Sequence, residues 1–199
     1  LEIPFTQVSI QDDFWCERLD INRQHSLEHQ WQQLENSGCI QNFRLVADQA
    51  EEGSPHNGWF FADSDAYKWL DAAARAYSSG QQPALQEHID DLIDLITRAQ
   101  TADGYLYTYN QLLFPTSRWE NLQIEHELYC HGHLIEAAVS HYEATGQKIL
   151  LQAGIQAANL LLHTFLGCGP QQTPGHEEIE IALIRLADAT GEQAYLQLA

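Results

Sequence analysis

The chain reveals its fold most clearly at Glu125-His126-Glu127-Leu128-Tyr129-Cys130-His131-Gly132-His133, which opens a helical pattern that continues to about Ala144. At about 100° per residue, His126, Cys130 and His133 fall on one face of that helix. The opposite side carries an apolar stripe made of Leu128, Ile135, Val139 and Tyr142. This pattern predicts a helix that lines a cavity with imidazole and thiol groups. A surface helix with scattered histidines is the alternative.

The composition is that of a globular chain with an acidic surface. Its 199 residues, 44% of them hydrophobic, suffice for one domain with a sizeable core or for part of a larger one. Nine Lys and Arg against 28 Asp and Glu give a net charge of −19. That balance argues against binding to nucleic acid or to an anionic membrane, because both need a cationic surface. We therefore expect a soluble protein with a neutral or cationic ligand.

Cysteine usage and the chain ends bear on location and completeness. The cysteines at 16, 39, 130 and 168 are widely spaced, which fits neither a zinc knuckle nor a disulfide framework and favours a reducing, cytoplasmic location. The first five residues lack the charged and apolar regions of a signal peptide. The chain contains no methionine and has no Gly or Pro to end its last helix, so we expect a longer protein around it.

The hydrophobic pattern predicts an all-α domain over residues 17–199, preceded by an extended lead-in over residues 1–16. Besides the helix described above, we expect helices over residues 17–36, 42–51, 66–79, 83–100, 148–165 and 176–189. The aromatic run Tyr105-Leu106-Tyr107-Thr108-Tyr109 fits either a strand or an extended loop.

One supersecondary unit occurs twice. Ala144-Thr145-Gly146-Gln147 recurs as Ala189-Thr190-Gly191-Glu192, an offset of 45 residues that also places His131 on His176. The unit is a helix, a Thr-Gly turn and a second helix. Helical hairpins at this period indicate an open solenoid or a closed α/α toroid, and the loose repetition favours the toroid.

Three motifs carry candidate chemistry. The sequence from His126 to Cys130 differs by one residue from the H-E-x-x-H zinc pattern, but no spacing nominates the third ligand of a catalytic zinc. Asp63 and Asp65 could form an acid pair or a metal site; a helix N-terminal cap is the favoured interpretation. His176 follows a Pro-Gly turn and opens a helix, where it could face a cavity or act as a cap.

Five motifs in order and spacing resemble the N-terminal part of one family, the β-L-arabinofuranosidases of glycoside hydrolase family 127. They are residues 61–70 (FADSDAYKWL), 103–106 (DGYL), 126–130 (HELYC), 132–137 (GHLIEA) and 175–180 (GHEEIE). The resemblance covers nearly the whole chain. It implies the N-terminal portion of an (α/α)6 barrel, followed in the complete protein by β-sandwich domains.

The resemblance also implies a retaining enzyme that releases L-arabinose from the non-reducing end of β-L-arabinofuranosides. In this family a zinc-held cysteine thiolate is the nucleophile and a glutamate is the acid/base. The motifs that supply these residues and the Zn2+ ligands should lie beyond Ala199, so neither a catalytic nor a metal residue is expected in this segment. His126 and His176 align with family histidines that hydrogen-bond the arabinofuranose hydroxyls.

Two residues depart from the family pattern, and rival functions remain. Ala62 stands where Gln is expected, and Glu177 stands where Pro is common. The implied partner is an arabinofuranoside-containing oligosaccharide or glycoconjugate, and a homodimer is a possible assembly. The rivals are a sugar epimerase or another carbohydrate-active enzyme on an α/α barrel, and a non-catalytic helical-repeat binding module.

Overall fold

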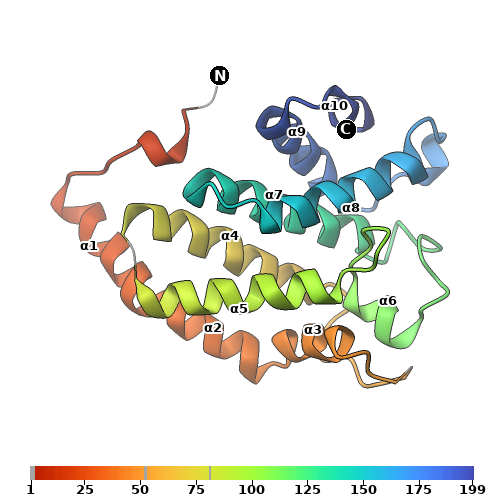
Figure 1. Cartoon of the computed structure of the whole chain (residues 1–199), viewed down its shortest axis with the longest axis horizontal. Coiled ribbons are helices and arrows are strands. Elements are labelled where there is room, and N and C mark those ends of the chain that lie inside the picture. The colour runs from red at the N-terminus through yellow and green to blue at the C-terminus, as the bar shows by residue number, and fades with distance from the viewer. Residues whose placement is uncertain (1–2, 52, 81) are drawn as a thin grey trace.

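The computed structural model describes residues 3–51, 53–80 and 82–199, and every regular element in these ranges is helical (Figure 1). The α-helices are α1 (Asp13–Ile21), α2 (Leu27–Asn36), α3 (Cys39–Ala47), α4 (Asp63–Ser79), α5 (Pro83–Ala99), α6 (Thr108–Leu113), α7 (Glu127–Thr145), α8 (Ile149–Phe165), α9 (Glu178–Thr190) and α10 (Gln193–Leu198). The predicted all-α class is confirmed. No helix in the described ranges has the length and hydropathy to cross a bilayer.

The helices form two layers of successive hairpins. In one layer α7 packs between α4 and α9, and in the other α5, α8 and α10 cover these three helices from outside. Figure 1 shows α4 and α7 side by side, with α5 and α8 returning in the opposite direction. This arrangement places the first turns of α4 and α7 at the same end of the layer.

Helix α7 connects the two parts of the core. One cluster joins α2, α3, α4 and α5 to α7 and α8, and α7 contributes Cys130, Leu134, Ala137 and Ala138 to it. The other joins α7 and α8 to α9 and α10, with Leu128, Ile135 and Val139 from α7. The predicted apolar stripe of α7 is therefore buried, but the helix is enclosed on both sides rather than on one.

The N-terminal region is more helical than predicted. Leu1 and Glu2, the first residues of the predicted lead-in, lie outside the described residues. Phe5–Gln7 forms a 3-10 turn. Helix α1 begins at Asp13, within the predicted lead-in, because the Asp12 carboxylate accepts a hydrogen bond from the Trp15 amide at 2.7 Å. A π-helical turn over Asn22–Ser26 then joins α1 to α2.

The aromatic run after α5 is an extended connection that ends at Thr108, where α6 begins. The amides of residues 106–108 donate to side chains instead of to a neighbouring strand. His131 Nε2 accepts from the Leu106 amide at 3.3 Å, and the Asp63 carboxylate accepts from the Thr108 amide and hydroxyl at 2.7 and 2.5 Å. Asp63 is thus a buried anchor rather than the favoured helix cap, and burial raises its pKa to about 6.

The two Thr-Gly turns are built alike. Gly146 and Gly191 end α7 and α9 with φ values of 72° and 78°, a left-handed conformation that suits glycine. In each turn the threonine hydroxyl donates to the carbonyl four residues earlier and accepts from the amide two residues later. The sequence repeat therefore corresponds to the same C-terminal turn at the ends of two helices.

Gly104 offers a direct test of how the turn after α5 packs against α8. Its φ is +98°, and a Cβ there would lie 2.3 Å from the Gln156 carbonyl oxygen of α8. We predict that Gly104→Ala lowers the free energy of unfolding by about 3 kcal/mol or more, since it combines backbone strain with a backbone clash. Gly146→Ala is the matched control: nothing lies within 4 Å of its Cβ position, so only the left-handed strain of about 1–2 kcal/mol applies. Equal losses in chemical denaturation would contradict the clash.

Candidate functional site

The first turns of α7 and α9 are brought together by the loops that precede them. The Gly175 amide donates to the Leu122 carbonyl at 3.1 Å. A Cβ at Gly175 would lie 2.1 Å from the Gln123 carbonyl oxygen, so only glycine permits this approach. The contact places the rings of His126 and His176 with their centroids 6.3 Å apart. The two predicted site histidines, 50 positions apart in the sequence, are thus neighbours.

Tyr129 lies among three imidazole rings. Its ring centroid is 5.0 Å from that of His126 and 4.5 Å from those of His176 and His133, all in edge-to-face geometry. The Lys68 ammonium, from α4, donates to the Tyr129 hydroxyl at 2.6 Å. Tyr129 is thus in contact with three imidazole rings and with one cation.

The two histidines present opposite hydrogen-bonding groups. His126 Nδ1 lies 2.9 Å from the Ile124 carbonyl oxygen, so this nitrogen carries the proton and Nε2 is an acceptor. His176 Nδ1 accepts from the Glu178 amide at 3.2 Å, so in the neutral ring Nε2 carries the proton and is a donor. An acceptor and a donor side by side match a hydroxyl group, which both donates and accepts.

A buried ion-pair network lies next to these rings. The Arg185 guanidinium donates to Glu136 at 2.8 Å and to the Ser140 hydroxyl at 2.9 Å. Burial alone would raise the pKa of Glu136, but the hydrogen bonds from Arg185 and Glu178 outweigh it and lower that pKa. Burial, together with the bond to Glu136 and its charge, raises the pKa of Glu178 to about 8.

The same network contains the closest approach to a metal-ligand set in the described ranges. Ligand atoms of His133, Glu136 and Glu178 lie within 4.8 Å of one another, a spacing that an ion could bridge. Arg185, bound to Glu136, already supplies the positive charge that an ion would bring. Burial lowers the pKa of His133 to about 4, so its ring is neutral. Arg185 also lies 3.6 Å from a second carboxylate, that of Glu143.

Contrary to the prediction from the sequence, Cys130 does not lie on a cavity-lining face with His126 and His133. The side chain is fully buried in the core against α4, its sulfur lies 3.9 Å from the Phe61 carbonyl oxygen, and burial raises its pKa well above the ordinary value. The prediction failed because His126 is the residue before α7, with φ −89° and ψ 39°, so a helical projection does not extend to it. The described residues whose ligand atoms cluster are His133, Glu136 and Glu178, so the structure gives no support to a zinc site through His126 and Cys130.

Sequence reasoning missed Lys68, Tyr129, Glu136 and Glu178 as members of the site. For two of these residues, Glu136 and Glu178, there was a feature that could have pointed to them. Glu136 is polar on a helix that is buried on both sides, and Glu178 follows His176 by two residues. The contact of Lys68 with Tyr129 joins residues 61 positions apart on different helices, and no local pattern encodes it.

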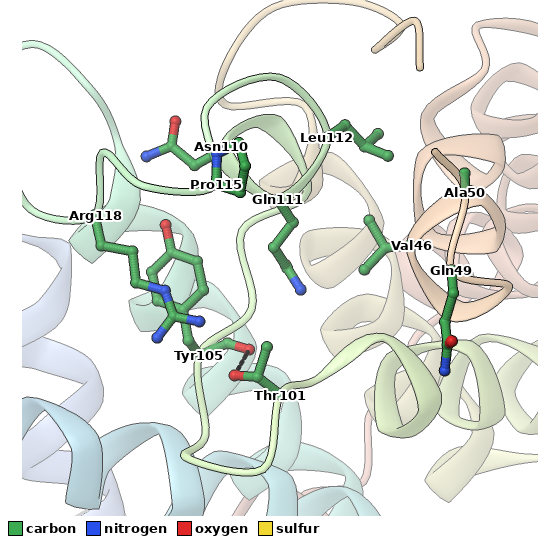
Figure 2. Close-up of a pocket in the computed structure, with 10 residues that line it drawn as sticks. All are labelled: Val46, Gln49, Ala50, Thr101, Tyr105, Asn110, Gln111, Leu112, Pro115 and Arg118. Atoms are coloured by element: carbon green, nitrogen blue, oxygen red, sulfur yellow. Dashed lines mark hydrogen bonds between the residues drawn. The ribbon is translucent and has the colours of Figure 1, made fainter. Parts of the chain in front are cut away.

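A separate cavity of about 270 Å³ lies beside α3, α6 and the turn after α5 (Figure 2). Figure 2 shows Gln111 pointing between the two sides of this cavity, with Arg118 over the ring of Tyr105 at 4.0 Å from its centroid. Arg118 is the charged residue of the lining, and it is bound to Asp103 at 2.7 Å. Among the described residues, no carboxylate, imidazole or thiol lines the cavity.

Comparisons with known proteins identify the family. Residues 7–199 match the model of the β-L-arabinofuranosidase, GH127 catalytic domain. A non-reducing end β-L-arabinofuranosidase from Bifidobacterium longum is 33% identical over 219 aligned residues, which cover 96% of this chain and 32% of the relative. The chain therefore spans about a third of the length of this curated relative.

Solved structures agree with this assignment. A GH127 β-L-arabinofuranosidase from Geobacillus stearothermophilus T6 is 40% identical with a TM-score of 0.89, over 96% of this chain and 31% of that one. A second GH127 β-arabinofuranosidase is 34% identical with a TM-score of 0.87, over 97% of this chain and 32% of that one. With a family model that covers nearly all of its residues, the chain belongs to the GH127 β-L-arabinofuranosidase family.

Proposed function

We propose that the complete protein is a retaining glycoside hydrolase that releases L-arabinose from the non-reducing end of β-L-arabinofuranosides. In this proposal the present chain forms part of the sugar-binding wall. Family membership over residues 7–199 supports the activity. The proposed role of this chain rests on the pair His126 and His176. His126 presents an acceptor and His176 a donor, and the centroids of the two rings lie 6.3 Å apart.

We further propose that the two helical layers are part of an (α/α)6 barrel. The layer of α4, α7 and α9 would be the inner ring and the layer of α5, α8 and α10 the outer ring. Apolar side chains of the last hairpin support this view: Ile181 and Ile184 of α9 and Leu196 of α10 are 44–50% exposed, and a further hairpin would cover them.

Sugar binding follows from the groups at the start of α7 and α9. A hydroxyl of the arabinofuranose donates to Nε2 of His126 and accepts from Nε2–H of His176, while the ring of Tyr129 lies below the sugar. Each imidazole has one ring nitrogen bonded to the backbone and offers the other to a ligand. A site that hydrogen-bonds a hydroxyl discriminates strongly against an analogue that lacks it.

The bond-breaking groups of this proposal lie outside residues 1–199. A bound zinc would keep a cysteine thiolate ready to attack the anomeric carbon, and a glutamate would act as acid/base. The two buried thiols of this chain, Cys39 and Cys130, do not fit that role, because burial raises their pKa values. No metal-ligand cluster in the described part of the chain contains a cysteine. A cytoplasmic location, proposed because all four cysteines are free thiols, completes the proposal.

The activity itself is tested with a synthetic aryl β-L-arabinofuranoside. We expect the complete protein to hydrolyse it and a zinc chelator to abolish the reaction, because zinc maintains the thiolate nucleophile. The isolated 199-residue chain should be inactive, since it lacks nucleophile and acid/base. Hydrolysis by a pure sample of the isolated chain, or its absence from the complete protein with zinc present, would contradict the proposal.

The histidine pair is tested in the complete protein. We predict that His126→Ala and His176→Ala each lower kcat/KM by at least about tenfold, or about 1.4 kcal/mol of transition-state binding. Gln should restore more activity than Asn at both positions, because its amide reaches the place of Nε2. His163→Ala is the matched control, since this histidine is exposed on α8, and it should behave like wild type. Wild-type kinetics in both alanine variants would remove these residues from the site.

A further inference from the structure

The side chain of Glu178 is held between α7 and α9. It lies in the first turn of α9 and is 7% exposed. A Cβ at Gly132 of α7 would lie 2.8 Å from Glu178 Cγ, so the two helices approach closely only because residue 132 is glycine. The carboxyl group therefore has few alternative positions, and its neighbours decide its chemical state.

The carboxyl group of Glu178 lies close to that of Glu136: one ligand oxygen of each, together with a ring nitrogen of His133, lies within 4.8 Å of the others. A carboxylate has no hydrogen to donate, so a hydrogen bond between two carboxyl groups requires one of them to be protonated. Glu178 Oε1 lies 3.1 Å from His133 Nδ1, but the two atoms do not meet the geometric criteria of a hydrogen bond. Two like charges in such a buried site would repel strongly.

The charged groups around Glu178 decide whether Glu178 or Glu136 is protonated. From α7 they are Glu136 and the neutral His133; from α9, Arg185; from α4, Lys68. Arg185 is bound to Glu136, which stabilises that group as the carboxylate. Lys68 directs its hydrogen bonds to Tyr129 and Ser64, at 2.6 and 3.3 Å. The ion-pair partner of Glu178 in the described ranges is His133, whose Nδ1 lies 3.1 Å from Oε1, and burial lowers the pKa of that ring to about 4, so it brings no charge. Of the two carboxyl groups, Glu178 is therefore the one that holds a proton.

Glu178 is also joined to the proposed sugar site. Its backbone amide donates to Nδ1 of His176, which leaves the proton of that ring on Nε2. On the other side, His133 contacts Tyr129 edge-to-face, and Tyr129 contacts His176 in turn. A displacement of Glu178 would therefore also move His176, both through the backbone amide and through the ring contacts of His133 and Tyr129.

We propose that Glu178 is a positioning residue: as a neutral acid bound to Glu136, it holds the start of α9 so that His176 presents Nε2–H to the sugar. This inference rests on the proposed function of His176. Loss of the Glu178 proton would place two carboxylates in contact and push the first turn of α9 away from α7. The site would then lose its donor without any change in His176 itself.

The test is the pH dependence of kcat/KM in the complete enzyme. For wild type we predict a decline above about pH 8, where Glu178 loses its proton. Glu178→Gln keeps a neutral donor toward Glu136, so it should retain activity within about threefold at pH 6–7 and lose this decline. Glu178→Ala should be at least about tenfold less active at every pH. Glu177→Gln, which removes an exposed carboxylate next to the site, is the matched control and should keep the decline.

An unchanged decline in Glu178→Gln would overturn the proposal, as would activity as low as that of Glu178→Ala at all pH values. Loss of one bound metal equivalent from the purified protein on Glu178→Gln would also overturn it, in favour of a cation held by His133, Glu136 and Glu178.

A second readout needs no activity and separates this inference from the proposed function. Because the pKa of Glu178 is about 8 in the folded protein against 4.5 ordinarily, folding keeps a proton that the unfolded chain releases. The carboxyl group's contribution to stability is therefore complete below about pH 4.5 and is lost as pH rises toward 8. We expect Tm to fall more steeply over this range in wild type than in Glu178→Gln. Parallel curves would reject the protonated state even if the enzyme acts on another sugar.

Discussion

The close packing of α7 between α4 and α9 is the constraint on which the rest of the structure depends. Small residues make it possible: a Cβ at Gly132 would meet Glu178, and a Cβ at Gly154 of α8 would lie 2.9 Å from Ala138. Residues 127–141 of α7 are all buried or half-buried, so few of its polar side chains reach solvent. Most of these side chains find a partner inside the protein, because an unpaired buried polar group is costly; His141, whose ring nitrogens have no partner among the described residues, is the exception.

These partners organise the site. Glu127 accepts from the Tyr105 hydroxyl at 2.6 Å and from the Trp119 amide at 2.8 Å, and His131 bonds to the Leu106 amide. Two parts of the segment that precedes α7, at Tyr105–Leu106 and at Trp119, are thereby fixed to its first turns. Glu136, farther along the helix, binds Arg185 of α9 in the same way. Polar groups that α7 cannot expose thus fix the loops and helices around the two histidines.

The sequence predicts the parts of this arrangement that depend on local pattern. The two Thr-Gly turns, the placement of His126 and His176 at helix starts, and most of the helices, though not α6 or the first turn of α1, follow from periodicity and turn chemistry. It does not predict the burial of Cys130 or the anchoring role of Asp63, whose partner Thr108 is 45 positions away. Such contacts depend on which helices pack together, and periodicity carries no information about that.

The opposite tautomers of the two histidines arise from the backbone rather than from residue type. His126 is bonded to a carbonyl two residues before it, and His176 to an amide two residues after it. The two departures from the family pattern leave these bonds intact. Glu177 has a largely exposed side chain, and the amide that binds His176 belongs to Glu178. Ala62 is buried, and its carbonyl accepts from Cys39 at 3.2 Å. The donor and acceptor positions are therefore set by the turns, and sugar recognition should tolerate both substitutions.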